Sequence, residues 1–391
     1  MDLDLSAAEI SFRNEVREWL KENIPTNRVP QFGPDKRRFE LEWQRQQFDA
    51  GWAGINWPEE FGGRGFSLTQ QMIWFEEYAW ADGPEVNVCF CALNHAGPTL
   101  IARANRELKA EHLPRILRGE AVWSQGFSEP DAGSDLAAIS TSAQRDGEVL
   151  VVNGQKTWTS YAELSDYQEL LVRTSSDSNR HHGLTWVICD MTSPGIDIRP
   201  IKEMTGEGHF CEVFYDDVRI PLTNVVGELN DGWSVAMSTL SFERGTAFIR
   251  EQVATLREVE ELIEVARTTT DSRGRTLIAD ESIALRLATV RAEAQALSAM
   301  TLAMISRNSR RSQPGADSSM VRYFFSTLRK RIALLAMDIL GVPGLERTGR
   351  GDPDSWSENY LHSYAATIAA GTMDIQSNII AQRVLGLPRG R

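Results

Sequence analysis

The stretch EVLVVNGQKTWTS (148–160) marks the point at which the sequence changes from helical to strand-like character. Two strand-like runs flank Asn153 and Gly154, a dipeptide that favours a two-residue turn because both turn positions must accept positive φ. We therefore predict a β-hairpin that turns at these two residues. Further strand-like runs follow, separated by turn formers as in a compact antiparallel barrel or sandwich: YQELLVRTS, GLTWVICDM, GIDIRPI and CEVFYDDVRIP.

Helical periodicity lies on both sides of this strand-rich region. Ser6 and Glu9 form a capping box before apolar residues at helical spacing, and INWPEEFGGRG (55–65) interrupts the helical pattern that continues to about Gly119. After Gly232 the helical period returns, with long segments at about 278–308, 316–341 and 372–385. The order predicts an α+β fold with a helical domain at 1–121, a strand domain at 122–230 and a helical domain at 231–391.

The composition restricts the classes of protein to consider. With 391 residues, 42% of them hydrophobic and 24% charged, the chain should form a well-packed globular protein of two or three domains. Its net charge of −13 argues against a nucleic-acid surface, which needs basic clusters. No import signal and no apolar run of about 18 residues is visible, so we expect a cytoplasmic protein without a membrane span.

The cysteines give no indication of a metal centre. Of the four, only Cys89 and Cys91 are close in sequence, and they lack both the CxxC spacing and the companion histidines of a zinc site. We therefore predict reduced thiols and no metal.

Two polar stretches are candidates for ligand binding. In WSQGFSEPDAGSDL (123–136), small residues let backbone N–H groups approach a ligand, and Ser128 and Ser134 add hydroxyl groups. The alternative is a cluster of surface turns. Trp158 could present its aromatic face to a planar ligand, or it could be an ordinary core residue.

Two further stretches carry ionisable or capping groups. LSFERGTAFI (240–249) sets Glu243 beside Arg244, and helical neighbours point about 100° apart, so each charge needs a partner of its own. Glu243 is therefore either a structural or a catalytic carboxylate. In TIAAGTMDIQSNIIAQRVLGLP (367–388), Thr372 can cap a helix whose first amides suit an anionic cofactor group, or simply cap it.

Taken in order, these stretches resemble the acyl-CoA dehydrogenase family over essentially the whole chain. The resemblance implies an N-terminal helical domain, a middle β-barrel and a C-terminal four-helix bundle, with FAD between barrel and bundle. The implied reaction is α,β-dehydrogenation of an acyl-CoA thioester to the trans-2-enoyl-CoA. An electron-transfer flavoprotein or a similar acceptor would then reoxidise the flavin.

The catalytic base is where this sequence departs from many members, which have a glutamate directly before the Gly-Thr of the last stretch. Ala370 occupies that position here. A minority of members places the base in a motif ending Glu-Arg, which LSFERG resembles, so the resemblance implies Glu243 as base. Ala370 would keep its backbone N–H as a donor to the thioester oxygen. Members of this type often handle branched or bulky acyl groups, including steroid-derived ones, which we expect as substrates.

The same residue-by-residue matching implies further site residues. The flavin would be lined by residues from three of the stretches: Phe127, Ser128, Gly133, Ser134, Trp158, Thr159, Ser160, Thr372 and Asp374. Ser134, Ser241 and Arg244 would lie near the substrate.

Assembly is a second point of departure. In typical members a neighbouring subunit holds the adenine end of FAD with an RxxxG stretch and a Gln-containing segment ending in paired glycines. The matching places here have Thr270 for arginine, Asp338 for glutamine and Val342 for the second glycine. We therefore expect an α2β2 hetero-oligomer in which a homologous chain supplies that half-site. A homo-oligomer with loosely held FAD, a flavin oxidase and a non-catalytic partner subunit are the alternatives.

Overall fold

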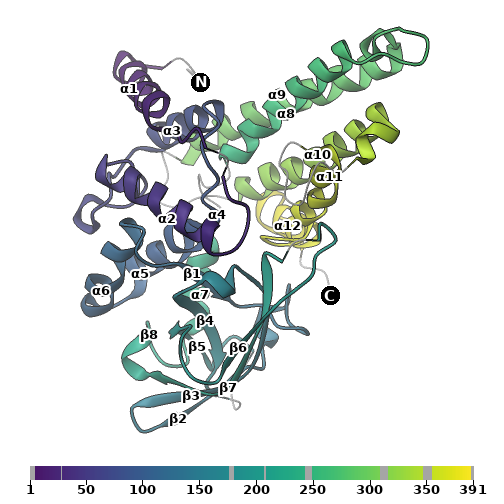
Figure 1. Cartoon of the computed structure of the whole chain (residues 1–391). Coiled ribbons are helices and arrows are strands. Elements are labelled where there is room, and N and C mark those ends of the chain that lie inside the picture. Colours follow the sequence, from purple (N-terminus) through teal and green to yellow (C-terminus); the bar gives the residue numbers. More distant parts are fainter. Residues whose placement is uncertain are drawn as a thin grey trace. The chain divides into compact units, whose positions relative to one another are not determined.

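The computed structural model describes residues 5–27, 29–175, 180–206, 208–242, 249–308, 316–346 and 355–388. Figure 1 shows helices of the start of the chain in purple, helices of its end in green and yellow, and strands of the middle of the sequence in blue to teal. The predicted α+β fold class is thus confirmed. Two compact units are formed: unit 1 by Met1–Pro25, Ser67–Gly83 and Arg244–Arg391, and unit 2 by Thr26–Phe66 and Pro84–Glu243.

Unit 2 is built on an eight-stranded sheet. Its strands are β1 (Trp123–Gly126), β2 (Ser142–Asp146), β3 (Val149–Ser160), β4 (Tyr167–Arg173), β5 (Leu184–Asp190), β6 (Ile196–Pro200), β7 (Phe210–Pro221) and β8 (Val225–Val226). The strand order is β6-β7-β3-β2-β4-β5-β8, and β1 pairs with β4 in parallel. Helices of the same unit are α2 (Gly33–Asp49), α4 (Asn87–Cys91), the π-helix η2 (Ala92–Ala96), α5 (Gly97–Arg103), α6 (Arg106–Leu117) and α7 (Gly232–Phe242).

The sheet is buried on both faces at β4 and β5. Along β5, Trp186 and Ile188 belong to a cluster that includes apolar residues of the helices, whereas Val187 and Cys189 belong to a second cluster within the strands. This alternation follows the two-residue period of a strand, and burial on both faces explains the continuous apolar run. The sheet therefore forms a rigid base for the loops at its edges.

The predicted hairpin turn is wrong. Asn153 and Gly154 lie inside β3, and the chain reverses instead around Gly147, between β2 and β3. The dipeptide marks an irregularity: the register of β3 against β7 shifts at Gly154, whose φ is +149°. A Cβ on Gly154 would lie 2.7 Å from the Cα of Thr141, so glycine is required by close backbone approach.

Unit 1 is helical in its described part. It contains α1 (Ala7–Asn23), α3 (Leu68–Trp80), α8 (Ile249–Thr268), α9 (Glu281–Asn308), α10 (Asp317–Leu340), α11 (Trp356–Ser363), α12 (Met373–Ile379) and the π-helix η10 (Ile380–Val384). The predicted capping box of α1 is confirmed, with Ser6 accepting from the Glu9 N–H and Glu9 accepting from the Ser6 N–H. In the described ranges no helix is both long and apolar enough to cross a bilayer.

A buried ion pair joins the loop after β1 to strand β3 in unit 2. The Lys156 ammonium lies 2.8 Å from a carboxylate oxygen of Glu129, and their side chains are 0% and 5% exposed. Glu129 also accepts from the backbone N–H groups of Ser140 at 2.6 Å and Thr141 at 2.9 Å, and Lys156 donates to the carbonyl of Phe127 at 3.0 Å. Burial alone would raise the pKa of Glu129, but Lys156 and these hydrogen bonds outweigh it and lower the pKa to about 2.

We expect Glu129→Gln to lower the free energy of unfolding by about 3–5 kcal/mol, because it leaves the Lys156 ammonium buried without a counter-charge. Urea denaturation at neutral pH measures this difference. Asp146→Asn is the control, since Asp146 pairs with Arg219 at the surface and should contribute less than about 1 kcal/mol. Equal losses in the two variants would contradict the structural role of the buried pair.

The same pair predicts that the free energy of unfolding decreases at acidic pH. The pKa of Glu129 in the folded protein is about 2, below the value of about 4.3 for a glutamate in the unfolded chain. The stability that the ion pair contributes is therefore complete above about pH 4.3 and is lost as the pH falls toward the folded pKa. The stability difference between wild type and Glu129→Gln should therefore narrow between about pH 5 and pH 3. A difference that stays constant over this range would show that Glu129 is not the titrating group.

Candidate functional site

The buried pair brings together two of the stretches singled out in the sequence. Glu129 follows β1 in the SEPDAGSD stretch, and Lys156 lies in β3 within NGQKTWTS. Next to it, the N–H of Thr157 donates to the carbonyl of Ser128 at 2.9 Å. Phe127 is 4% exposed and belongs to the core, so the predicted residues Phe127 and Ser128 are fixed against the strand that carries Trp158.

Trp158 lies on a strained part of β3. Its φ is +59°, in a region that bulky residues rarely adopt, and the pairing with β7 shifts register between Lys156 and Thr159. The indole is 58% exposed and rests edge-on against Phe210, with ring centroids 5.9 Å apart. The interpretation of Trp158 as a core residue is therefore wrong. The irregular backbone presents a large aromatic surface outward.

Thr159 and Ser160 continue this strand end. Thr159 is fully buried, and its hydroxyl oxygen has no hydrogen-bond partner among the described residues. A buried polar group left in this state costs about 1–3 kcal/mol, so the position favours a ligand with a polar edge. Ser160 is exposed.

The remaining loop residues of unit 2 lie at its surface. An isolated bridge between Glu129 and Ala132 closes a tight turn, after which Gly133 and Ser134 are exposed. A Cβ placed on Gly133 would meet no atom within 4 Å, so there is open space beside the backbone. The loop can therefore admit a ligand without rearrangement of its neighbours.

Unit 1 carries the other group of predicted residues, around Ala370. Ala370 has φ +54° and Gly371 has φ +88°. The Gln376 amide donates to both of their carbonyls, at 3.1 and 3.4 Å, and Arg322 donates to the carbonyl of Ala369 at 3.1 Å. No described residue accepts a hydrogen bond from the Ala370 N–H. The carbonyls of this turn are thus held by side chains while one backbone donor remains available.

Thr372 and Asp374 follow directly. Thr372 is the N-cap of α12, as predicted, and its hydroxyl accepts from the Ile375 N–H at 3.3 Å. Asp374 lies exposed in the first turn.

The predicted base lies outside the described residues, as does Arg244 beside it. Glu243 follows α7, which ends at Phe242. Near that end Ser241 is exposed, and its hydroxyl donates to the Ser238 carbonyl at 2.7 Å. Two residues before Ser241, the hydroxyls of Thr239 and Thr99 lie 2.8 Å apart in the core and fix α7 to α5.

Sequence reasoning missed the ion pair that organises this part of unit 2. In the sequence, Glu129 and Lys156 are single members of two separate motifs, SEPDAGSD and NGQKTWTS. The sequence did contain an indication of a buried ion pair. Lys156 lies among strand-forming residues, and a lysine is rarely buried without a partner. The identity of its partner, 27 residues earlier, could not be read from the spacing.

Comparison with known proteins assigns all three parts of the chain to one family. Residues 6–120, 124–218 and 230–385 match the N-terminal, middle and C-terminal domains of acyl-CoA dehydrogenase. The chain is 40% identical to the acyl-CoA dehydrogenase IpdE1 of Mycobacterium tuberculosis, with 97% of each chain covered. It is 36% identical to acyl-CoA dehydrogenase FadE26 of the same organism over 87% of this chain and 86% of that protein.

Solved structures agree with this assignment. The Tcur3481-Tcur3483 steroid ACAD superposes with a TM-score of 0.87 at 29% identity, covering all of both chains. The ChsE4-ChsE5 complex from Mycobacterium tuberculosis gives a TM-score of 0.82 at 32% identity, again with full coverage of both. The chain therefore belongs to the acyl-CoA dehydrogenase family, whose members are FAD-dependent oxidoreductases.

Proposed function

We propose that this acyl-CoA dehydrogenase binds FAD and oxidises a bulky, steroid-derived acyl-CoA, with Glu243 as the catalytic base. The observation that carries the proposal is the turn at Ala370, which lacks a carboxylate but keeps an N–H with no acceptor among the described residues. Such a turn can bind the substrate oxygen while the base comes from another position. The sequence offers that base in LSFERG.

The residues present fit a flavin. Trp158 offers an exposed aromatic face to a planar ring, and the buried Thr159 hydroxyl has no partner among the described residues. By resemblance to the family, further cofactor contacts are proposed for Phe127, Ser128, Gly133, Ser134, Ser160, Thr372 and Asp374. Bound FAD would supply the acceptor for the hydride that leaves the β-carbon.

The chain's own groups would then perform three tasks. Glu243 removes the α-proton, for which desolvation by bound substrate strengthens the carboxylate as a base. The Ala370 N–H stabilises the negative charge that develops on the thioester oxygen. Ser134, Ser241 and Arg244 would position the substrate near these groups.

The acyl group is proposed from the relatives. One structural neighbour that covers the full chain is described as a steroid ACAD, and a substrate of that class is large and rigid. An electron-transfer flavoprotein or a similar acceptor would receive the electrons. Rapid aerobic turnover with release of peroxide, without any added acceptor, would instead identify a flavin oxidase.

Replacement of the base is the most direct test. Co-expressed with the homologous chain, Glu243→Gln should retain as much FAD as wild type but lower kcat by about 10²- to 10⁴-fold, because an amide cannot accept the α-proton. Stopped-flow reduction of the flavin by a steroid acyl-CoA measures this step.

The matched control is Glu264→Gln, an exposed glutamate of α8 that pairs only loosely with Arg267. It should react like wild type. Activity of Glu243→Gln within about tenfold of wild type, or about 1.4 kcal/mol in barrier, would refute the assignment. If wild type binds FAD but no acyl-CoA reduces that flavin, the chain is a non-catalytic partner subunit.

Trp158 tests the flavin side. Trp158→Ala should shift the flavin absorption band and weaken FAD retention, with little loss of stability because the indole is already 58% exposed. Trp80→Ala, which removes an indole that is 54% exposed in α3, is the control and should leave the spectrum unchanged. An unchanged flavin spectrum in Trp158→Ala, or a stability loss of about 3–5 kcal/mol, would contradict the proposed contact.

The adenine-side positions favour a heteromeric assembly. Asp338 in α10 forms an ion pair with Arg286 of α9, and Val342 is 81% exposed. A carboxylate and a branched side chain are both unfavourable where a pyrophosphate must approach the backbone. Two solved structures similar to this chain have descriptions that name two proteins each. They are the Tcur3481-Tcur3483 steroid ACAD and the ChsE4-ChsE5 complex.

We therefore expect the chain to form an α2β2 assembly with a homologous chain and to bind two FAD per four chains. Purified alone, it should retain less than one FAD per chain, and co-expression with the homologous chain should restore binding. Native mass spectrometry and flavin absorbance report assembly and stoichiometry. A stable homo-oligomer with one tightly bound FAD per chain would refute the heteromeric arrangement.

A further inference from the structure

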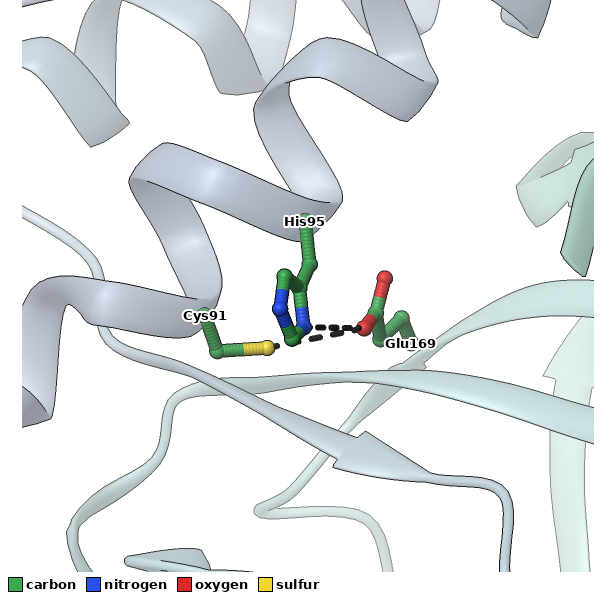
Figure 2. A group of neighbouring side chains, drawn as sticks. All are labelled: Cys91, His95 and Glu169. Atoms are coloured by element: carbon green, nitrogen blue, oxygen red, sulfur yellow. Dashed lines mark hydrogen bonds and ion pairs between the residues drawn. The ribbon is translucent and has the colours of Figure 1, made fainter. Parts of the chain in front are cut away.

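A cluster of three potential metal ligands lies inside unit 2, apart from the residues assigned above. Figure 2 shows Cys91 and His95 from one helical segment facing Glu169 from the sheet. Cys91 ends α4, His95 lies in the π-helix η2, and Glu169 lies in β4. Their thiol, imidazole and carboxylate atoms all lie within 4.8 Å of one another.

The spacing fits tetrahedral coordination. Ligands about 2.1–2.3 Å from Zn²⁺ at tetrahedral angles lie about 3.4–3.6 Å from each other. The Nδ1 atom of His95 lies 3.5 Å from Oε1 of Glu169, and the Sγ atom of Cys91 lies 3.6 Å from the same oxygen. Both distances match the edges of such a tetrahedron.

Charge distinguishes Glu169 from three other buried acids. Glu40, Glu77 and Glu129 are each buried beside a lysine or arginine. Glu169 is fully buried, its neighbours are His95, Gln125 and Cys91, and its Oε2 has no hydrogen-bond partner in the described part of the chain. A dication would balance a thiolate and a carboxylate to zero net charge, which removes the cost of burying either one alone.

The imidazole is oriented for such a ligand. The amide nitrogen of Gln125, which can only donate, lies 3.3 Å from Nδ1 of His95 and 2.8 Å from Oε1 of Glu169. Nδ1 thus faces both the Gln125 amide and the Glu169 carboxylate, and in its deprotonated form it can bind a metal there. Phe90 packs edge-on against the ring at 5.3 Å and fixes its plane.

We propose that Cys91, His95 and Glu169 bind one Zn²⁺ ion, with the side-chain oxygen of Gln125 as a fourth ligand after rotation of its amide. Gln125 and Glu169 are direct partners in the β1–β4 ladder, so both oxygen ligands come from adjacent strands. Thiolate, imidazole and carboxylate are ligands that Zn²⁺ accepts together. Binding forms the S–Zn bond as the Cys91 thiol loses its proton to solvent.

Metal titration tests the site independently of turnover. The full chain, freed of metal with a chelator, should bind one Zn²⁺ whether or not it carries FAD, and Co²⁺ in its place should show a thiolate-to-cobalt charge-transfer band. Cys91→Ala should abolish that band. Glu169→Gln should weaken Zn²⁺ affinity at least about tenfold.

Cys89→Ala is the matched control. Cys89 lies two residues earlier in α4, is buried, and contacts the Glu40 carbonyl rather than the cluster, so this variant should bind Co²⁺ like wild type. Circular dichroism and thermal melting confirm that each variant is folded. Wild type that takes up no stoichiometric Zn²⁺ or Co²⁺, or Co²⁺ binding that persists unchanged in Cys91→Ala, would overturn the proposal. An infrared band of a neutral Glu169 acid in metal-free solution, combined with no uptake, would identify a proton as the neutralising group.

Discussion

The ion pair between Glu129 and Lys156 is the constraint on which the flavin-side half of the proposed site depends. Removing both charges from water is expensive, and the pair is tolerated because four further hydrogen bonds from Ser140, Thr141 and to Phe127 complete their shells. Those hydrogen bonds end on the loop after β1 and on β3. The ion pair therefore fixes the loop after β1 against β3. Hydrophobic packing alone would allow the two segments to shift, because it is not directional.

That fixation explains how a strained residue can be maintained. Trp158 follows Lys156 by two positions, and its positive φ is unfavourable for a tryptophan. The strand on one side is held by the buried ammonium, and on the other side Thr159 is paired again with Cys211 of β7. The irregularity is confined between these two anchors. Side chains also hold the turn at Ala370. Gln376 and Arg322 donate hydrogen bonds to carbonyls of this turn, so its conformation does not depend on a glutamate side chain at position 370.

The sequence predicted the order of helices and strands because both depend on local periodicity. The segments 281–308 and 317–340 lie close to the expected ranges. Asn153-Gly154 was misread because the conformations that permit a hairpin turn also permit a bulge, and contact with Thr141 selects the bulge. The motif residues of unit 2 lie on the loop and strand that were expected. Their geometry could not be predicted, since the pairing of Glu129 with Lys156 and the exposure of Trp158 arise from packing between distant segments.

The cluster at Glu169 could not be predicted from the sequence either, because its residues come from segments that are far apart in the chain. Cys91 and His95 are four residues apart, a spacing that places them on one helical face, but the third ligand comes from a strand 74 residues beyond His95. A buried carboxylate must be neutralised by a cation, a proton or a metal. Unit 2 gives lysines to Glu40 and Glu129, with each ammonium 2.8 Å from its carboxylate, and supplies only soft or neutral groups to Glu169. None of those groups carries a fixed positive charge, but they are atoms that a divalent metal binds, so the proposed Zn²⁺ would supply the charge that neutralises Glu169.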